Sequence, residues 1–501
     1  MNRLIPILIA LLVGLSSCSD SNDTPDPDVP TPGALNRYLC LNVAVAGGRE
    51  SRAADGTTAE EDEGYDKEHT IRNNENMVSA ITAIIYPASA DINNDASANT
   101  TTVRAFSWKV TPSKYSGTQA TGFTTGPRLL PEDLSEGDYK LLVIANLDYA
   151  SVLDGQSLET VRDLLYPSLP YSASSLDPDK ANDPLYTKDF IMTSIKEVGL
   201  SLHSAPANGG TGPQGSLKNP FVPKDEIQLD RLAARVDLAL DKDSCHEYTD
   251  SDGSKAYYYE YPVIDEENNQ VGKFQLTHAM VFNISKNQFL FKHTSEALDV
   301  DKLQVPGRET QEWKGGKLCA TNYVVDPLIY FRNTAKDFIS SFFDPKFYHD
   351  NITVNKDYLQ KKARVPNCED NTRFDSWTVD GKTTYRYYTM AYSAENTVMV
   401  NYQVAQGHLL RTAYLTGIRF YGRYILNGGT TDKNLAFDYF IRHSGTSGKV
   451  DTSQPMAYGV VRNNIYRVYI NSIHSRKGDF FIKLNVDVLP WQKYTHSGIY
   501  M

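Results

Sequence analysis

Short runs of alternating apolar and polar residues constrain the fold of this chain more than any other feature. The clearest run is FIKLNVDVL at 481–489, where four aliphatic residues alternate with Lys483, Asn485 and Asp487. A period of two places successive side chains on opposite faces of a β-strand. Pro490 follows, and proline stops a strand because it donates no hydrogen bond to the ladder. The stretch therefore predicts a half-buried strand that ends at residue 489.

Runs of this kind recur along the chain and predict an all-β protein. They are rich in β-branched and aromatic residues, and many of the 32 glycines and 24 prolines separate them. The 501 residues are enough for about two to four domains. The expected strands are 38–46, 80–86, 104–110, 139–145, 188–193, 226–240, 256–262, 275–284, 385–392, 397–404, 412–424, 465–473 and 481–489, with short helices at 157–165 and 333–343.

A stretch rich in glycine, proline, alanine and serine divides the chain into two halves. It covers residues 204–224, and such a composition is typical of a hinge or a long surface loop. Strands of the same kind lie on both sides of it. We therefore expect one β-rich domain over 53–225 and a second over 226–489.

The first residues have the features of an export signal. Arg3 supplies a positive charge, and the apolar stretch 4–15, of about twelve residues, is too short to span a bilayer. Small residues precede Cys18, as in the lipobox of bacterial lipoproteins. We expect 1–17 to be a signal peptide and Cys18 to carry lipid, with a chance cysteine after an ordinary signal peptide as the alternative. Polar residues 19–23 resemble the acidic tag that sends some lipoproteins to the outer surface.

The first strand is followed at once by a loop that carries two arginines. The strand covers 38–46, and two glycines separate it from Arg49 and Arg52. This loop is small and polar and offers an easy cut to a trypsin-like protease. One face of the strand is aliphatic and consists of Leu39, Leu41, Val43 and Val45.

The sequence lacks the short motifs of common catalytic, nucleotide and metal sites. It contains no HExxH, Walker loop, strand-following GxGxxG or GxSxG. Its ten histidines are scattered, and its five cysteines have no zinc spacing. We therefore expect no metal, no cofactor and no catalytic residue. The sequence leaves open whether one disulfide forms among Cys245, Cys319 and Cys368. The net charge of −11 without a basic stripe argues against nucleic acid as a partner.

Several short stretches carry a resemblance to a known family. With the lipobox, the first strand and the arginine loop, they resemble the fimbrillins of Bacteroidales, the lipoprotein subunits of type V pili. The likeness covers roughly residues 15–501 and is greatest to the major-subunit branch of the minor fimbrium. The stretches are IMTS at 191–194, DRLAARV at 230–236, YSAENT at 392–397, YGVVRNNIY at 458–466 and LPW at 489–491.

This resemblance implies two tandem transthyretin-like β-sandwiches and assembly by strand exchange. An Arg-specific surface protease would remove the lipidated segment 18–52 with its first strand, by a cut between Arg52 and Ala53 or, as second choice, after Arg49. The vacated groove would accept the C-terminal tail 490–501 of another copy. The apolar and aromatic residues of that tail are Trp491, Tyr494, Ile499, Tyr500 and Met501.

The resemblance implies a stalk subunit of a surface fimbria that supports adhesion. Such a subunit is first anchored in the outer membrane and later joined to copies of itself and to other fimbrial subunits. One alternative is an accessory subunit at the anchor or the tip. Another is a surface lipoprotein that binds glycans or host proteins, for which Tyr257, Tyr258 and Tyr259 are either sugar-stacking or sheet-filling residues. An enzyme is the remaining alternative, since carboxylates that are distant in sequence can meet across a fold.

Overall fold

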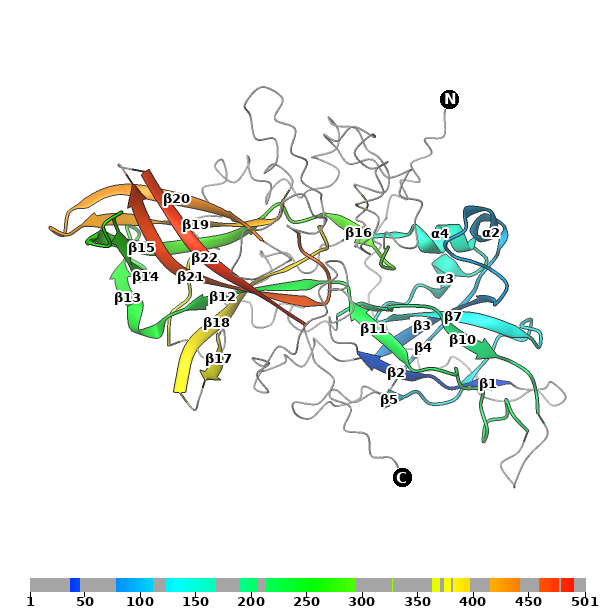
Figure 1. The fold of residues 1–501 in the computed structure, drawn as a ribbon. Helices are drawn as coiled ribbons and strands as arrows, with labels where there is room; N and C mark the ends of the chain where they lie inside the picture. Colours follow the sequence, from blue (N-terminus) through cyan, green and yellow to red (C-terminus); the bar gives the residue numbers. More distant parts are fainter. Residues whose placement is uncertain are drawn as a thin grey trace, which may run out of the picture.

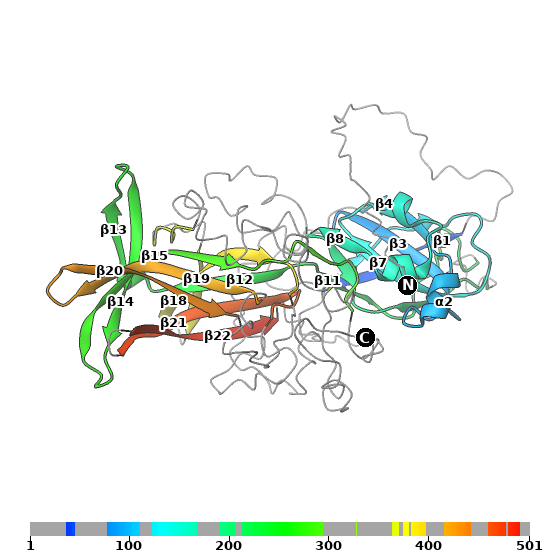
Figure 2. The same cartoon turned by 90° about the horizontal axis from the view of Figure 1, so that it is seen from above.

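The computed structural model consists of two β-rich halves, with blue and cyan strands gathered in one half and orange and red strands in the other (Figures 1 and 2). Within the described residues the chain is mostly strand, with a few short helices. The predicted all-β fold class is confirmed. The structure describes residues 37–45, 78–110, 123–167, 190–205, 213–293, 327, 363–369, 374–379, 382–396, 415–441, 459–476 and 479–490.

An eight-stranded sheet forms the N-terminal half. Its order is β4-β3-β7-β9-β11-β2-β5, and β10 pairs with β7. The apolar run AITAIIYP forms the inner strand β3, which is buried along most of its length. The strands are β2 (Asn42–Val45), β3 (Ala80–Pro87), β4 (Arg104–Lys109), β5 (Phe123–Thr124), β7 (Asp138–Ala145), β9 (Met192–Ser194), β10 (Val198–Ser201) and β11 (Ile227–Arg231). A separate pair joins β1 (Tyr38–Leu39) to β6 (Arg128–Leu129).

Three short helices accompany this sheet, α2 (Asp95–Thr100), α3 (Ala150–Leu153) and α4 (Leu158–Arg162). The Ser157 hydroxyl caps α4 by accepting a hydrogen bond from the Thr160 N–H at 3.1 Å. The apolar residues of α4 pack into a second core cluster with the outer face of β3 and β7. The helix predicted at 157–165 is confirmed only over its first part, since Leu165 already begins β8 (Leu165–Pro167).

A ten-stranded sheet forms the C-terminal half. Its order is β17-β18-β12-β21-β14-β15-β19-β20, with β13 paired to β14 and β22 paired to β21. The strands are β12 (Ala234–Leu240), β13 (Cys245–Thr249), β14 (Lys255–Ile264), β15 (Gln270–Phe282), β17 (Phe374–Val379), β18 (Lys382–Ser393), β19 (Gly417–Leu426), β20 (Thr431–Phe440), β21 (Asn464–Arg476) and β22 (Asp479–Pro490).

Most strands predicted from the sequence are present with small shifts of their ends. The strand predicted at 481–489 is confirmed as β22, and the one at 188–193 is confirmed only in its last part, as β9. The strand expected at 397–404 and the helix expected at 333–343 lie outside the described residues.

The pattern over 226–240 predicts one long strand, and this prediction is wrong. The residues form two strands, because β11 belongs to the N-terminal sheet and β12 to the C-terminal sheet. The break lies at Leu232 and Ala233. The Leu232 N–H donates to the Ile191 carbonyl at 2.9 Å, and the Ala233 carbonyl accepts from the Asn463 N–H at 2.8 Å. The chain therefore changes sheets at 232–233, whereas its composition places the domain boundary at 225.

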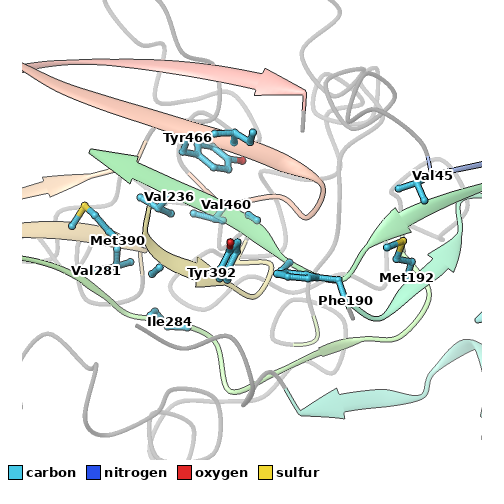
Figure 3. Close-up of a cluster of buried hydrophobic side chains, with 14 of the residues drawn as sticks. Val45, Phe190, Met192, Val236, Val281, Ile284, Met390, Tyr392, Val460 and Tyr466 are labelled. Carbon is cyan, nitrogen blue, oxygen red and sulfur yellow. The ribbon is translucent and has the colours of Figure 1, made fainter. Parts of the chain in front are cut away.

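The apolar core continues from one half into the other. Figure 3 shows Val45 and Met192 from the N-terminal sheet near Phe190, which points toward Tyr392 of β18. The rings of Phe190 and Tyr392 lie 4.9 Å apart, edge to face. A further link is the pairing of β16 (Asn287–Phe289) with β8 of the N-terminal half. The halves are therefore joined by packing and by main-chain hydrogen bonds.

Candidate functional site

The first strand lies in a slot within the N-terminal half, and this slot is the candidate site. We call residues 38–45 the first-strand segment; it consists of β1, two linking residues and β2. Its main chain is hydrogen-bonded on both sides, as the position of β2 between β11 and β5 indicates (Figure 1). The sequence predicts a continuous strand over 38–46, and the structure divides it at Cys40 and Leu41 while keeping the bonds to both neighbours.

The aliphatic face of the first-strand segment is completely buried. Its four side chains have no exposed surface and belong to the main core cluster, together with Phe221 and Ile227 from one neighbouring stretch and Leu130 from the other. These side chains, Leu39, Leu41, Val43 and Val45, are the aliphatic face that the alternation predicts. The other face is also largely buried: Cys40 is 7% exposed and Ala44 is 2% exposed.

The stretch 123–130 forms one wall of the slot. β5 and β6 pair with the first-strand segment in the antiparallel direction, with Val43 opposite Phe123 and Leu39 opposite Arg128. Between them, the Thr125 N–H donates to the Leu41 carbonyl at 2.8 Å, and the Thr125 hydroxyl accepts from the Leu41 N–H at 2.9 Å. Thr125 thus replaces a regular ladder bond at the point where the strand is divided.

The stretch 215–229 forms the opposite wall, in the parallel direction. β11 pairs with β2 so that Ile227 lies opposite Val43. Before β11, the Phe221 carbonyl accepts from the Cys40 N–H at 2.8 Å, and the Phe221 N–H donates to the Tyr38 carbonyl at 2.8 Å. If the first-strand segment were removed, two rows of main-chain groups and an apolar trough would be open to another strand.

Cys40 is the polarisable side chain inside the slot. Its thiol donates a hydrogen bond to the Thr125 carbonyl at 2.7 Å. Burial raises the pKa of the Cys40 thiol, and contacts with Thr125 and Leu41 offset only part of that rise. The side chain therefore stays protonated and behaves as a small apolar group and a weak donor.

Apolar burial and chain ordering nearly balance for this segment. Four buried aliphatic side chains contribute roughly 6–12 kcal/mol, at ~1.5–3 kcal/mol each. Ordering eight residues costs roughly 8–16 kcal/mol of backbone entropy, at ~1–2 kcal/mol per residue. The net balance is therefore small, so the covalent tether matters: a cut peptide would lose the high local concentration that favours the bound state.

The other predicted site residues lie outside the described residues. They are Cys18, Arg49, Arg52, Ala53, Trp491, Tyr494, Ile499, Tyr500 and Met501. Of the residues predicted for cleavage and strand exchange, the structure therefore describes only those of the first strand. It shows in addition that β22, which precedes the tail, pairs with β21 in the C-terminal sheet.

The described residues provide little that suggests catalysis. They contain no group of three His, Cys, Asp or Glu side chains that could hold a metal ion. None of their helices is long and apolar enough to cross a membrane. Of the three tyrosines considered for sugar binding, Tyr259 is fully buried and donates to the Pro366 carbonyl at 3.1 Å, whereas Tyr257 and Tyr258 are partly exposed.

Two important residues of the slot could not be found from the sequence. Thr125 and Phe221 contact the first-strand segment from positions far along the chain. Neither belongs to a motif, and a single threonine or phenylalanine carries no signal of its partner. Only the alternation within the first-strand segment indicated that a matching trough must exist.

Comparisons with known proteins find similar structures among bacterial adhesion and fimbrial proteins. No protein-family model matches the chain, and no curated protein matches it in sequence. A candidate cell adhesion protein from Parabacteroides distasonis is 11% identical, with a TM-score of 0.42, over 92% of this chain and 99% of its own. Another from that species is 14% identical, with a TM-score of 0.40, over 91% of this chain and 100% of its own.

A tip fimbrial protein with a C-terminal truncation, from Porphyromonas gingivalis, is 13% identical to this chain. Its TM-score is 0.35, over 91% of this chain and 100% of its own. The sequence motifs resemble fimbrillins, and the structural neighbours are adhesion and fimbrial proteins. This chain is similar to solved cell adhesion and fimbrial proteins of Parabacteroides distasonis and Porphyromonas gingivalis.

Proposed function

We propose that this chain is a structural stalk subunit of a surface fimbria that assembles by protease-triggered strand exchange. One observation carries the proposal: the first-strand segment fills an apolar slot with hydrogen bonds on both sides. In the sequence, the arginine loop with Arg49 and Arg52 follows directly. A strand that is needed to complete the fold thus lies just ahead of an easy cut site.

Before cleavage, the chain's own strand protects the slot. The trough is full and the neighbouring ladder groups are paired, so no other chain can add a strand there. The precursor can therefore travel as a monomeric lipoprotein, anchored by lipid at Cys18, to the outer membrane surface. The first-strand segment acts in this state as a built-in chaperone.

After cleavage, the slot becomes a receptor for a strand of another copy. A cut between Arg52 and Ala53, or after Arg49, separates the first-strand segment from the rest of the chain. A new strand would restore the two rows of main-chain hydrogen bonds and refill the trough, as in donor-strand complementation. The required donor presents aliphatic or aromatic side chains toward the trough.

The proposed donor is the tail 490–501 of a neighbouring subunit. It follows β22, an outer strand of the C-terminal sheet, and contains Trp491, Tyr494 and Ile499. A contact between the tail of one copy and the slot of the next does not close on itself, so it builds a filament. Other fimbrial subunits and an Arg-specific protease complete the set of proposed partners, with host proteins or glycans as adhesion ligands.

Deleting residues 491–501 is expected to leave a soluble folded monomer that cannot polymerise. The slot and both sheets lie within residues that remain, whereas the proposed donor is lost. The measurement is the ladder of oligomers on unheated gels after treatment with an Arg-specific protease. As a matched control, alanine at both Gln492 and Lys493 removes only polar side chains and should preserve the ladder. Ladders from the truncated protein would refute the donor assignment.

A further inference from the structure

We propose that Cys245 and Cys368 close a disulfide bond in the exported protein. This assignment goes beyond the proposed function: it rests on the export that the sequence predicts, but not on cleavage or strand exchange. Cys245 is the first residue of β13, opposite Tyr259 of β14. Cys368 lies in the stretch 363–369, far along the chain. Both side chains are partly buried and pack against the main core cluster.

Two contacts bracket the cysteine pair. On one side, the Tyr259 hydroxyl donates to the carbonyl of Pro366 at 3.1 Å. On the other, the Lys242 ammonium lies 3.0 Å from a carboxylate oxygen of Glu369. Stretches 242–245 and 366–369 therefore lie side by side, and the two thiols between these contacts are within hydrogen-bonding reach of each other.

The stretch that carries Cys368 is itself anchored to the C-terminal sheet. The Ala363 carbonyl accepts from the Ala279 N–H at 2.8 Å, and the Val365 N–H donates to the Thr277 carbonyl at 3.0 Å. These bonds hold the stretch along β15, a few residues before Cys368. The C-terminal sheet therefore holds the stretch with Cys368 close to Cys245, and the position of this stretch does not depend on a single surface contact.

The local chemistry favours a structural bridge over a reactive thiol. Burial, followed by the contact with Cys368, raises the pKa of the Cys245 thiol to about 12. A thiol of this kind is a poor nucleophile at neutral pH, so Cys245 lacks the activated thiolate of a redox catalyst. An exported protein, by contrast, folds where disulfides form and persist.

The bond forms by exchange with a disulfide-containing oxidant, which is a thiol oxidoreductase in the cell and oxidised glutathione in the test tube. The two protein thiols lose two protons and two electrons as the sulfur–sulfur bond forms, and the oxidant's disulfide is reduced to two thiols. The resulting link joins residues 245 and 368 and closes a long loop, which restricts the unfolded chain.

The test is thiol mapping of the full exported chain. The protein is blocked with an alkylating reagent under denaturing, non-reducing conditions and then digested. A linked pair of peptides containing Cys245 and Cys368 is expected, and reduction should separate it, whereas Cys40 should be alkylated before reduction. Complete alkylation of Cys245 and Cys368 before reduction, also after incubation with oxidised glutathione, would overturn the assignment. A link from either residue to Cys319 would do the same.

Variants provide a second, independent readout. Cys245→Ser and Cys368→Ser should each lower the Tm of the oxidised protein by roughly 5–15 °C. The double variant should lower it no further, because either change removes the same bond. Reduction of the wild-type protein should reproduce the loss, and Cys368→Ser should be insensitive to reductant. A Tm of the wild type that does not change on reduction would contradict the proposal even if one variant failed to fold.

Discussion

Replacing Arg462 with methionine is expected to lower the free energy of unfolding by about 3–5 kcal/mol. The Arg462 side chain is completely buried, and its guanidinium lies 2.9 Å from the carboxylate of Glu395, which is 2% exposed. It also donates to the carbonyls of Phe289 and Leu290, at 2.6 and 2.9 Å. Methionine fills much of the volume but removes the cation that faces the buried Glu395 carboxylate and the donor to the Phe289 carbonyl. The Leu290 carbonyl keeps a second bond, from the Thr193 hydroxyl at 3.1 Å.

The expected loss is large because Arg462 joins the two halves of the chain. Phe289 belongs to β16, which pairs with β8 of the N-terminal half, whereas Arg462 precedes β21 of the C-terminal sheet. Next to it, the Asn463 side chain accepts from Arg231 at 2.7 Å and donates to Asp230 at 2.8 Å.

Chemical unfolding in urea is the measurement, with Arg476→Met as the matched control. Arg476 lies at the end of β21, and its side chain is 67% exposed, so its loss should change stability little. Adding Glu395→Gln to Arg462→Met should recover part of the loss, because no buried carboxylate then lacks its partner. Equal losses for Arg462→Met and Arg476→Met would contradict this description of the junction.

Replacing both Arg49 and Arg52 with alanine is expected to abolish assembly. The first-strand segment then stays covalently attached, and its buried side chains keep the slot closed to another strand. The chain should accumulate as a full-length lipidated monomer on the outer membrane. The measurements are metabolic labelling with a fatty acid, which reports the retained Cys18, and the oligomer ladder on unheated gels.

Arg72→Ala provides the matched control, because Arg72 follows the same first strand but lies farther along the sequence. This variant should be trimmed and should assemble as the wild type does. If the double variant still forms ladders, cleavage in the arginine loop is not the trigger. If it assembles while retaining its lipid, an anchor or another accessory role explains the chain better than a stalk role.

The sequence predicted the strands well wherever local alternation decides the structure. β22 follows the alternating run at 481–489, and the buried face of the first-strand segment follows the positions of its aliphatic residues. In both cases, the alternation along one stretch of sequence is sufficient to place a strand there. Short apolar patterns of this type require no knowledge of distant partners.

The predictions from the sequence failed, or could not be made, where contacts between residues far apart in the chain determine the structure. The pattern over 226–240 continues smoothly through the break at 232–233, and only hydrogen bonds to Ile191 and Asn463 divide it. Buried arginines are a second case, since charged side chains usually lie at the surface. Arg231 and Arg462 are completely buried, and their partners Asn463 and Glu395 lie far along the chain.

The most direct test of the account is mass spectrometry of the assembled filament. The filaments are purified from the cell surface, digested without an Arg-specific enzyme, and compared with the full-length precursor. The account predicts that subunits in the filament begin at Ala53, or at Glu50 if Arg49 is cut, and that peptides from residues 38–45 are absent. Peptides from residues 38–45 in amounts equal to those from the C-terminal sheet would contradict it.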